Sequence, residues 1–385
     1  MLKKVLLKIL FSFPFLKKNV IILENNPDFD GSPMKVERDL KKKFPEGKFL
    51  FVWAVDKHCA IHSQEKTVAF WGGLTLIDKI KKYFYLARAI LIIDSNRPVF
   101  KWNPKTIRIY TSHGGTLKNC DKYMHSIGKV DYYLTLSDYL ADIDFEILKG
   151  RSVSSREQIL PIGLPLNDVI FEDFDLYRCG LLKGKRYDKI IGWLPTFRQH
   201  KNNDQSISLE NEKKFSLPLF QSQADFDRID AFLASKNTLL IVQLHPCQIS
   251  SLPANSYGNI LFITQEQKNQ YGITNMNLLH CFDGMITDYS AAYYEFLLLN
   301  RPIGLTIDDY EEYAAKIGFY IDYKRLVQGE RLSKIEDLET FIDNVVTGND
   351  VCRENRERSL HEIHNYADNQ SSERLIDFIA SKIDL

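Results

Sequence analysis

The residue most suited to proton transfer in this sequence is His113, which directly follows an apolar, β-branched run at 106–112 and precedes two glycines. A histidine at the end of a strand can act as a general base on an alcohol, because its pKa of about 6.5 lies close to neutral pH. Gly114 and Gly115 would let the backbone approach a ligand closely. A histidine that caps a tight turn is the alternative interpretation.

Two apolar runs in the second half of the chain, 189–194 and 238–244, lead into further candidates. The first is followed by the hydroxyl of Thr196 and the guanidinium of Arg198, and the second by the imidazole of His245. Because the carboxyl ends of parallel strands meet at one edge of a sheet, we expect these side chains to lie on neighbouring loops.

A third run, 284–287, ends at Thr287 and continues through Ser290 into a helical pattern. The free N–H groups and the dipole at a helix start favour phosphate, so a diphosphate is the expected ligand. Either hydroxyl could instead be an N-cap. Glu295, one turn after Ala291, could reach a ribose or polyol hydroxyl, although a solvated helix face fits it equally well.

Several familiar motifs are excluded. Residues 180–186 have the wrong spacing for a P-loop, and the histidines of 361–364 are three rather than four positions apart. The six cysteines are scattered singly, which argues against a zinc site or a disulfide framework and for a reducing compartment. The sequence therefore predicts no metal site.

Short apolar runs alternate with helical patterns along most of the chain, which predicts an α/β fold with parallel sheets covered on both faces. Such sheets bind ligands at the carboxyl ends of their strands, and two in tandem would enclose a cleft. The predicted strands are 19–24, 48–55, 89–94, 106–112, 132–137, 189–194, 238–244, 260–264, 284–287 and 302–307. The predicted helices are 33–43, 74–87, 138–149, 224–235, 291–300, 334–346 and 353–383.

The length of 385 residues suggests two domains. A less regular stretch rich in Asp, Gly and Lys is the candidate linker between them. The predicted order is a basic amphipathic segment at 1–18, a Rossmann-like acceptor domain at 19–170, the linker at 171–187, a Rossmann-like nucleotide-donor domain at 188–350, and C-terminal helices at 351–385 that pack back on the first domain.

The net charge and the N-terminal segment indicate whether the protein binds nucleic acid or a membrane. Fifty basic residues balance fifty acidic ones, so no global field attracts nucleic acid. Residues 1–18 carry five lysines and no acid, and their short, interrupted apolar run fits neither a cleavable signal nor a membrane span. The segment could lie on an anionic membrane, or it could be a first strand or helix with a basic fringe.

Six motifs then occur in one order and spacing. They are His113-Gly114-Gly115-Thr116-Leu117-Lys118, GLPLND at 163–168, PTFR at 195–198, ITDYS at 286–290, Arg301-Pro302 and GFYIDY at 318–323. Together these motifs resemble the CDP-glycerol:poly(glycerophosphate) glycerophosphotransferase family, the teichoic-acid primases and polymerases, over residues 19 to 323. The sequence departs from the family's common H-G-T-P-L-K, because Gly115 and Thr116 follow Gly114 and the proline is missing.

The resemblance implies a GT-B-like fold, in which two Rossmann-like domains with parallel sheets face each other across a cleft, and catalysis without a metal or cofactor. It implies that His113 removes the proton of the acceptor hydroxyl. It also implies that His245, Thr287 and Ser290 hold the donor diphosphate, and that Thr196 and Arg198 line the nucleotide side. The remaining predicted substrate-binding residues are Gly114, Lys118, Gly163, Asp288, Ala291 and Glu295.

The predicted reaction is transfer of a polyol phosphate, either glycerol phosphate or ribitol phosphate, from a CDP-polyol to a hydroxyl of a cell-surface glycan or of a teichoic-acid or capsule polymer, with release of CMP. The acceptor is expected to be lipid-linked and the protein to act in the cytoplasm, peripherally at the inner face of the cell membrane. Two alternatives stay open. One is a GT-B glycosyltransferase that uses a nucleotide sugar in capsular polysaccharide synthesis, and the other is a non-catalytic, membrane-associated binding or scaffold subunit.

Overall fold

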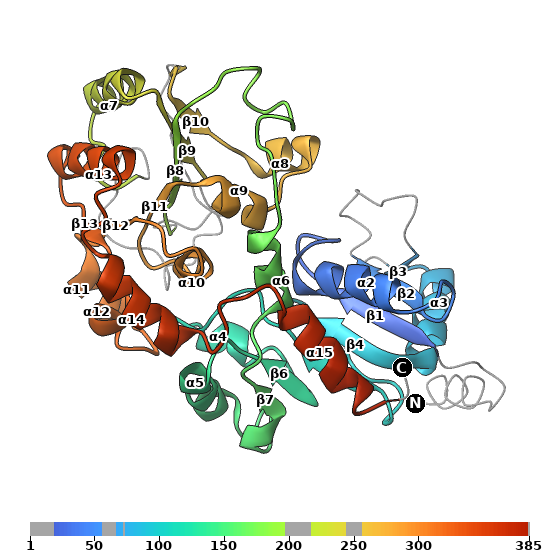
Figure 1. Ribbon diagram of the computed structural model, residues 1–385. Helices are drawn as coiled ribbons and strands as arrows, with labels where there is room; N and C mark the ends of the chain where they lie inside the picture. Colours follow the sequence, from blue (N-terminus) through green and yellow to red (C-terminus); the bar gives the residue numbers. More distant parts are fainter. Residues whose placement is uncertain (1–18, 56–66, 72–73, 197–216, 244–255, 384–385) are drawn as a thin grey trace. The chain divides into compact units, whose positions relative to one another are not determined.

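The computed structural model describes residues 19–55, 67–71, 74–196, 217–243 and 256–383, which form two compact units (Figure 1). Unit 1 consists of Met1–Gly115, Cys120–Val169 and Asp368–Leu385. Unit 2 consists of Thr116–Asn119 and Ile170–Ala367. Each unit is built on one parallel sheet.

The sheet of unit 1 has seven strands in the order β3-β2-β1-β4-β5-β6-β7, and every neighbouring pair is parallel. From β1 the chain adds β2 and β3 on one side, and it then returns to add β4 to β7 on the other side. This strand order is that of a Rossmann-like sheet. The strands are β1 (Val20–Glu24), β2 (Leu50–Val55), β3 (Val68–Phe70), β4 (Ala89–Asp94), β5 (Ile107–Tyr110), β6 (Tyr132–Leu134) and β7 (Ile159–Leu160).

Polar N-caps start the main helices of unit 1. Asp30 accepts from Gly31 N, Thr75 forms a capping box with Asp78, and Ser137 accepts from Leu140 N, so the first free N–H groups of these helices are satisfied. The helices are α2 (Gly31–Lys43), α3 (Leu76–Arg88), α4 (Asp121–Met124), α5 (Asp138–Leu148), α6 (Pro165–Asp168) and α15 (Ser371–Ala380), with a 3-10 turn η1 (Arg156–Gln158).

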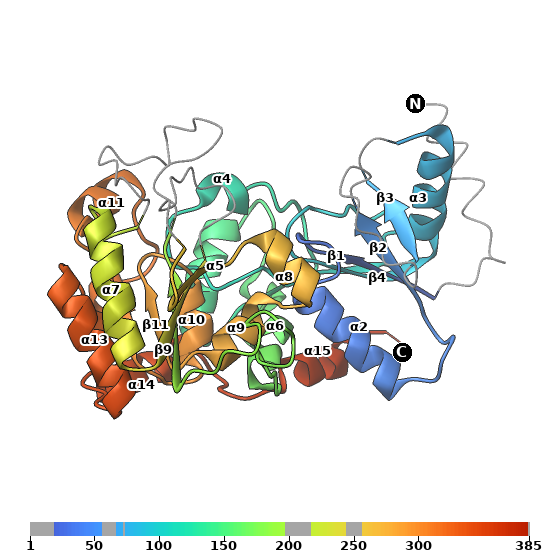
Figure 2. The same cartoon turned by 90° about the horizontal axis from the view of Figure 1, so that it is seen from above.

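Helices α2 and α3 cover opposite faces of the unit 1 sheet (Figure 2). Val52 of β2 packs into the cluster that contains Leu86 of α3. The next residue, Trp53, points the other way and donates from Nε1 to Glu37 of α2 at 2.9 Å. This alternation explains why the strand is apolar at consecutive positions, since both of its faces are buried.

The sheet of unit 2 has six strands in the order β10-β9-β8-β11-β12-β13, again all parallel. The strands are β8 (Lys189–Leu194), β9 (Thr238–Val242), β10 (Ile260–Phe262), β11 (Gly284–Thr287), β12 (Ile303–Leu305) and β13 (Glu330–Arg331). The helices are α7 (Gln223–Ser235), α8 (Gln265–Tyr271), α9 (Asn275–Cys281), α10 (Ala292–Leu297), α11 (Tyr310–Lys316), α12 (Tyr323–Leu326), α13 (Ile335–Thr347) and α14 (Arg353–Ile363), and a 3-10 turn η2 (Val169–Phe171) spans the boundary between the units.

The core of unit 2 joins one face of its sheet to α7 and α13. Trp193 of β8 packs with Phe226 of α7 and Phe341 of α13, and all three are fully buried. Burying a side chain of this size contributes about 1.5–3 kcal/mol. Within the described ranges, no helix is both long enough and apolar enough to cross a membrane.

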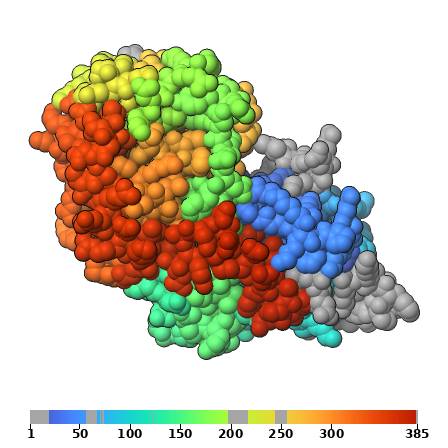
Figure 3. Space-filling view, in the orientation of Figure 1, coloured from blue at the N-terminus to red at the C-terminus, as the bar shows by residue number. Residues whose placement is uncertain are grey.

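The two C-terminal helices belong to different units. Helix α14 lies in unit 2, whereas residues 368–385 belong to unit 1, where α15 contacts α2 and α6. The space-filling view shows the red C-terminal residues against the blue surface of α2 (Figure 3). Residues 351–385 were predicted as one group of helices, and the structure divides them between 367 and 368.

Candidate active site

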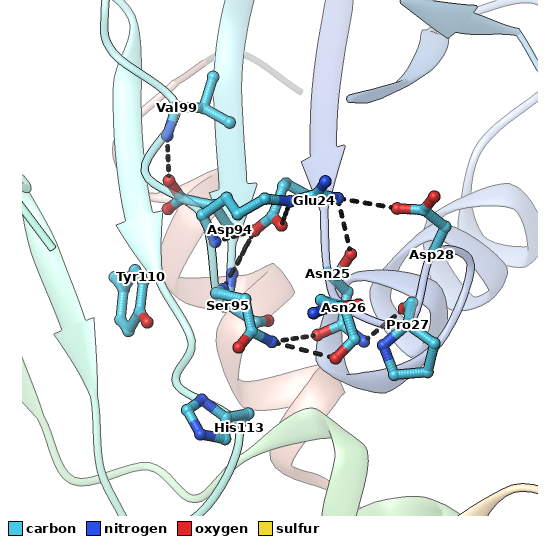
Figure 4. Close-up of polar contacts among 12 residues, drawn as sticks. Glu24, Asn25, Asn26, Pro27, Asp28, Asp94, Ser95, Val99, Tyr110 and His113 are labelled. Carbon is cyan, nitrogen blue, oxygen red and sulfur yellow. Dashed lines mark hydrogen bonds and ion pairs between the residues drawn. The ribbon is translucent and has the colours of Figure 1, made fainter. Parts of the chain in front are cut away.

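The strand ends of unit 1 place polar side chains in register. Glu24 at the end of β1 pairs with Asp94 at the end of β4, and Asp94 pairs with Tyr110 at the end of β5. His113 lies on the loop that follows β5 (Figure 4). The carboxyl edge of the sheet therefore carries two buried carboxylates and a buried phenol, and the loop after β5 carries an exposed imidazole.

Glu24 fixes the loop after β4. Its side chain accepts hydrogen bonds from the backbone N–H groups of Asn96 at 3.0 Å and Arg97 at 2.9 Å, and from Arg97 Nε at 2.9 Å (Figure 4). Arg97 also donates to Asp28 at 2.9 Å. Burial raises the pKa of Glu24, and its hydrogen bonds with Arg97 oppose that rise. No motif in the sequence predicted this network.

Asp94 holds β4 and β5 together. Its Oδ2 accepts from Val99 N at 2.8 Å and from Arg108 Nε at 2.9 Å, and Arg108 Nη2 lies 2.7 Å from the same oxygen. Burial raises the pKa of Asp94 to about 6 against the opposing effect of Arg108. A fully buried ion pair of this kind makes the strand ends a rigid support for the loop that carries His113.

The backbone before His113 is strained. Ser112 has a φ of +54° and its hydroxyl donates to Gly114 O at 2.9 Å. A left-handed conformation costs a residue with a side chain roughly 1–2 kcal/mol, which the surrounding contacts must offset. The His113 ring meets Tyr123 edge to face, with ring centroids 5.1 Å apart, and Nδ1 lies 3.1 Å from the Tyr123 hydroxyl. His113 is thus exposed but oriented.

The rest of the His113 motif pairs with the GFYIDY motif inside unit 2. Lys118 forms an antiparallel bridge with Phe319, and Tyr320 N donates to Leu117 O at 3.0 Å. Asn119 N donates to Gly318 O, also at 3.0 Å. Two motifs that are 200 residues apart in the sequence are therefore one structural element, and Lys118 takes part in it through its backbone.

The GLPLND motif docks the last helix of unit 1. Gly163 has a φ of +84°, and a Cβ there would lie 2.5 Å from Ser371 Oγ, so only glycine fits. Asp168 is buried and accepts from the backbone N–H groups of Ser371 at 2.9 Å and Ser372 at 2.8 Å, which caps α15. The contact with Ser371 explains why position 163 requires glycine. The predicted substrate contact of Gly163 stays a prediction.

At the sheet edge of unit 2, the predicted site residues hold β8 and β11 together. Thr196 N donates to both carboxylate oxygens of Asp288, at 2.8 and 3.1 Å, and the Thr287 hydroxyl donates to Leu194 O at 2.9 Å. Thr196, Thr287 and Asp288 are all buried. Their direct role is to join the two strand ends, and a ligand role for any of them stays a prediction.

The segment after β11 is short. Helix α10 begins at Ala292 with Ala291 as its N-cap, and Ser290 Oγ accepts from Ala292 N at 3.3 Å. The predicted helix 291–300 is therefore a helix of six residues, 292–297, with a half-buried serine hydroxyl at its start.

Glu295 is 4% exposed, so it lies on the buried rather than the solvated face of α10. Burial raises its pKa to about 8, so the carboxyl carries its proton at neutral pH. Among the residues that the structure describes, none forms a hydrogen bond with its Oε1. A neutral carboxyl can both donate to and accept from a ligand hydroxyl, which is the chemistry predicted for this position.

The tyrosine of the TDYS motif belongs to an aromatic cluster rather than to the strand edge. Tyr289 stacks on Tyr313 with ring centroids 3.9 Å apart and donates its hydroxyl to Asp309 at 2.7 Å. Tyr323 packs against the same ring and donates to Asp288 O at 2.9 Å. This cluster fixes the backbone on both sides of Asp288.

Two predicted donor-binding residues, Arg198 and His245, lie outside the described residues. Another motif residue, Arg301, is structural: its Nη1 donates to His280 O at 2.7 Å and to Phe282 O at 2.6 Å, which secures the end of α9.

Comparisons with known proteins agree with the predicted family. The family model described as CDP-Glycerol:Poly(glycerophosphate) glycerophosphotransferase matches residues 6–381. The chain is 24% identical over 353 residues to the teichoic acid poly(glycerol phosphate) polymerase of Bacillus subtilis strain 168, covering 83% of this chain and 43% of the polymerase. It is 26% identical over 320 residues to the teichoic acid ribitol-phosphate primase of Bacillus spizizenii, covering 76% of this chain and 75% of the primase.

The fold is similar to that of a solved wall teichoic acid polymerase, TagF, in a histidine-to-asparagine variant with CDPG. The TM-score is 0.73 at 18% identity, and the likeness covers 99% of this chain and 93% of the solved one. The predicted GT-B-like α/β fold with two parallel sheets is confirmed. The chain spans less than half of the length of the B. subtilis polymerase.

Proposed function

Because the chain belongs to the CDP-glycerol:poly(glycerophosphate) glycerophosphotransferase family, we propose that it transfers a polyol phosphate from a CDP-polyol to a hydroxyl of a teichoic-acid or related cell-surface polymer. The observation that carries this proposal is the match over residues 6–381, since it includes both α/β units rather than a single nucleotide-binding fold. Glycerol phosphate is the group that the family description favours, and ribitol phosphate is open to the same chemistry.

The proposed reaction is an in-line displacement at phosphorus. The acceptor oxygen forms a bond to the phosphorus that bears the polyol, and the bond from that phosphorus to the bridging oxygen breaks. The bridging oxygen leaves with CMP, and the acceptor's proton goes to a base. Because little covalent work falls to the protein, orientation and stabilisation of the phosphate charge supply most of the catalysis.

His113 is the proposed base. It is exposed, it lies on the loop after β5, and its ring is held at Nδ1 by Tyr123, which suits a group that must meet a hydroxyl in one orientation. Ser290 is the proposed contact for the donor phosphates from unit 2, with Thr287 and Asp288 positioning its loop through their bonds to Leu194 and Thr196. Glu295 is proposed to bind a ribose or polyol hydroxyl.

Sugar transfer from a nucleotide sugar is the less favoured function. It would use a similar fold, but the teichoic acid relatives reported above are named as a poly(glycerol phosphate) polymerase and a ribitol-phosphate primase. No residue among those described favours sugar over polyol phosphate.

The function is tested with a panel of donors. We expect the purified chain to release CMP from CDP-glycerol or CDP-ribitol in the presence of a lipid-linked polyol-phosphate primer. The primer should gain the mass of whole polyol-phosphate groups, measured by mass spectrometry. UDP-sugars serve as the comparison donors. Release of UDP with addition of a sugar would contradict the proposal, and so would the absence of any transfer from both CDP-polyols.

We further propose that the protein works at the inner face of the cell membrane, where α3 contributes to binding. This helix exposes apolar side chains that a soluble surface does not require: Leu76 is 69% exposed, Ile77 65% and Ile80 45%. Lys79 and Lys81 are exposed on the same helix. An exposed apolar stripe beside lysines matches an anionic lipid surface in both polarity and charge.

The end of α3 also meets the start of the described chain. Arg88, its last residue, donates to Asn19 Oδ1 at 3.0 Å. Residues 1–18, with five lysines and no acid, are proposed to bind the same anionic lipid surface.

Membrane binding is tested by sedimentation with vesicles of one part phosphatidylglycerol to about two parts phosphatidylcholine. We expect the double variant Ile77→Glu/Ile80→Glu to bind at least about 10-fold more weakly than the parent chain, since it loses two apolar anchors and gains two negative charges. Val351→Glu, at an exposed apolar position in unit 2, is the matched control. Equal binding of all three proteins would refute a role for α3.

A further inference from the structure

The hydroxyl of Tyr123 is the meeting point of three polar groups in unit 1. It lies 3.1 Å from Ser95 O, 3.1 Å from His113 Nδ1, and in short contact with the hydroxyl of Tyr110. Tyr123 is on the four-residue helix α4, ten residues after His113. No motif in the sequence marked it.

Each phenol in this group keeps its own proton. Burial is the largest cause that raises the pKa of Tyr123 and of Tyr110, in both cases well above the usual value. Both side chains are therefore neutral at any pH at which the protein would work. Each offers one O–H donor and an oxygen that can accept.

The single proton of Tyr123 can be assigned by counting donors. Ser95 O is a carbonyl oxygen, so it only accepts, and the Tyr123 hydroxyl must donate to it. If that proton pointed elsewhere, two oxygens would face each other at 3.1 Å without a hydrogen, beside a serine that is fully buried. With its proton committed to Ser95 O, the Tyr123 oxygen can only accept from Tyr110 and from His113.

We propose that Tyr123 is a positioning residue that holds His113 as the tautomer with its proton on Nδ1, so that Nε2 is the nitrogen that accepts the proton of the attacking hydroxyl. The hydrogen bond at one ring nitrogen decides which tautomer is present and fixes the ring plane. The inference deepens the proposed function and rests on it, since it assigns the basic atom of the proposed base.

The group that orients Tyr123 is itself fixed. Ser95 N lies 3.2 Å from Glu24 O, to which it donates, and Ser95 Oγ lies 2.7 Å from Thr111 Oγ1. Glu24 then holds the next two residues through Asn96 N and Arg97 N. The buried network at the ends of β1 and β4 thus sets the position of one carbonyl oxygen, and that carbonyl sets the direction of the Tyr123 proton.

The test compares Tyr123→Phe with Tyr110→Phe in the full chain. Tyr123→Phe removes the hydroxyl oxygen that faces Nδ1–H at 3.1 Å and keeps the ring. We expect kcat to fall about 10-fold or more while KM for CDP-glycerol changes less than about 2-fold, because the base is affected and donor binding is not. Tyr110→Phe removes a donor to Tyr123 but keeps the acceptor that faces His113, so its kcat should stay at least about five-fold above that of Tyr123→Phe.

Nitrogen-15 NMR of histidine-labelled protein reads the tautomer directly. The His113 signals are assigned by their loss in His113→Gln. We expect the parent chain and Tyr110→Phe to carry the proton on Nδ1, and Tyr123→Phe to shift toward the Nε2-protonated form that neutral imidazole prefers in water.

An Nε2 proton in the parent chain would overturn the inference, and so would a Tyr123→Phe spectrum and kcat equal to those of the parent. The spectra need no turnover, so they judge the tautomer even if His113→Gln proves fully active. A fully active His113→Gln variant would show that His113 is not the base, and the spectra would still decide which tautomer His113 adopts.

Discussion

Replacing His113 with glutamine should lower the turnover of polyol-phosphate transfer by about 10²–10⁴-fold, the range that a general base contributes. Glutamine can form hydrogen bonds but cannot take up the acceptor's proton. Because the side chain is exposed, its loss should leave the fold intact, as circular dichroism would show. CMP release measures turnover, and calorimetry should find unchanged affinity for CDP-glycerol.

His125→Gln is the matched control. His125 is also exposed and lies in the same unit at the end of α4, but no part of the proposed chemistry involves it. Its turnover should stay within about 2-fold of the parent. A His113→Gln variant that works as well as His125→Gln would eliminate His113 as the base, whereas loss of CDP-glycerol binding in it would indicate a binding role instead.

Most strands of both sheets could be predicted, because a buried strand is a short run of apolar residues in the sequence. The runs at 189–194 and 284–287 coincide with β8 and β11 residue for residue, since both are nearly continuous apolar segments that are largely buried. Strands β6, β10 and β12 have only three residues, but each was predicted as part of an apolar run of five or six residues, whereas β3, β7 and β13 were not predicted.

The C-terminal region shows the limit of helical periodicity. The sequence predicted one helix over 353–383, whereas the structure has α14 and α15 separated by residues 364–370. Within the gap, Asp368 accepts from Gln370 N at 3.1 Å, a local turn. The new helix start is capped by Asp168, which lies 203 residues before Ser371, and no local pattern could reveal that partner.

In the candidate site, too, the local features could be predicted and the long-range contacts could not. Residues at strand ends, such as His113 and Ser290, could be identified because a parallel sheet presents its carboxyl edge to ligands. What those positions touch could not be predicted. Asp288 is satisfied by Thr196 N across the sheet, and His113 by Tyr123 on a helix too short to have a periodicity. The contacts that orient a site are long-range, whereas the motifs that locate it are short.

The second large effect expected from the structure concerns stability. Asp168→Ala should destabilise unit 1 by about 3 kcal/mol, because it removes the acceptor for two buried N–H groups at the start of α15. It also removes the negative charge that lies 3.9 Å from the ammonium group of Lys35. For a domain of this size we expect the calorimetric transition that involves unit 1 to fall by about 6–12 °C.

The matched control for this prediction is Asp377→Ala on the same helix. Asp377 pairs with Lys43 of α2 at 2.6 Å, but the two side chains are 62% and 43% exposed, so water replaces the pair at little cost. Its transition should shift by less than about 2 °C. If the transition temperature of Asp168→Ala equalled that of Asp377→Ala, the buried cap would not be what holds α15 on unit 1. The glycine at position 163, whose missing Cβ leaves room for Ser371, would then be the better explanation for the docking of this helix.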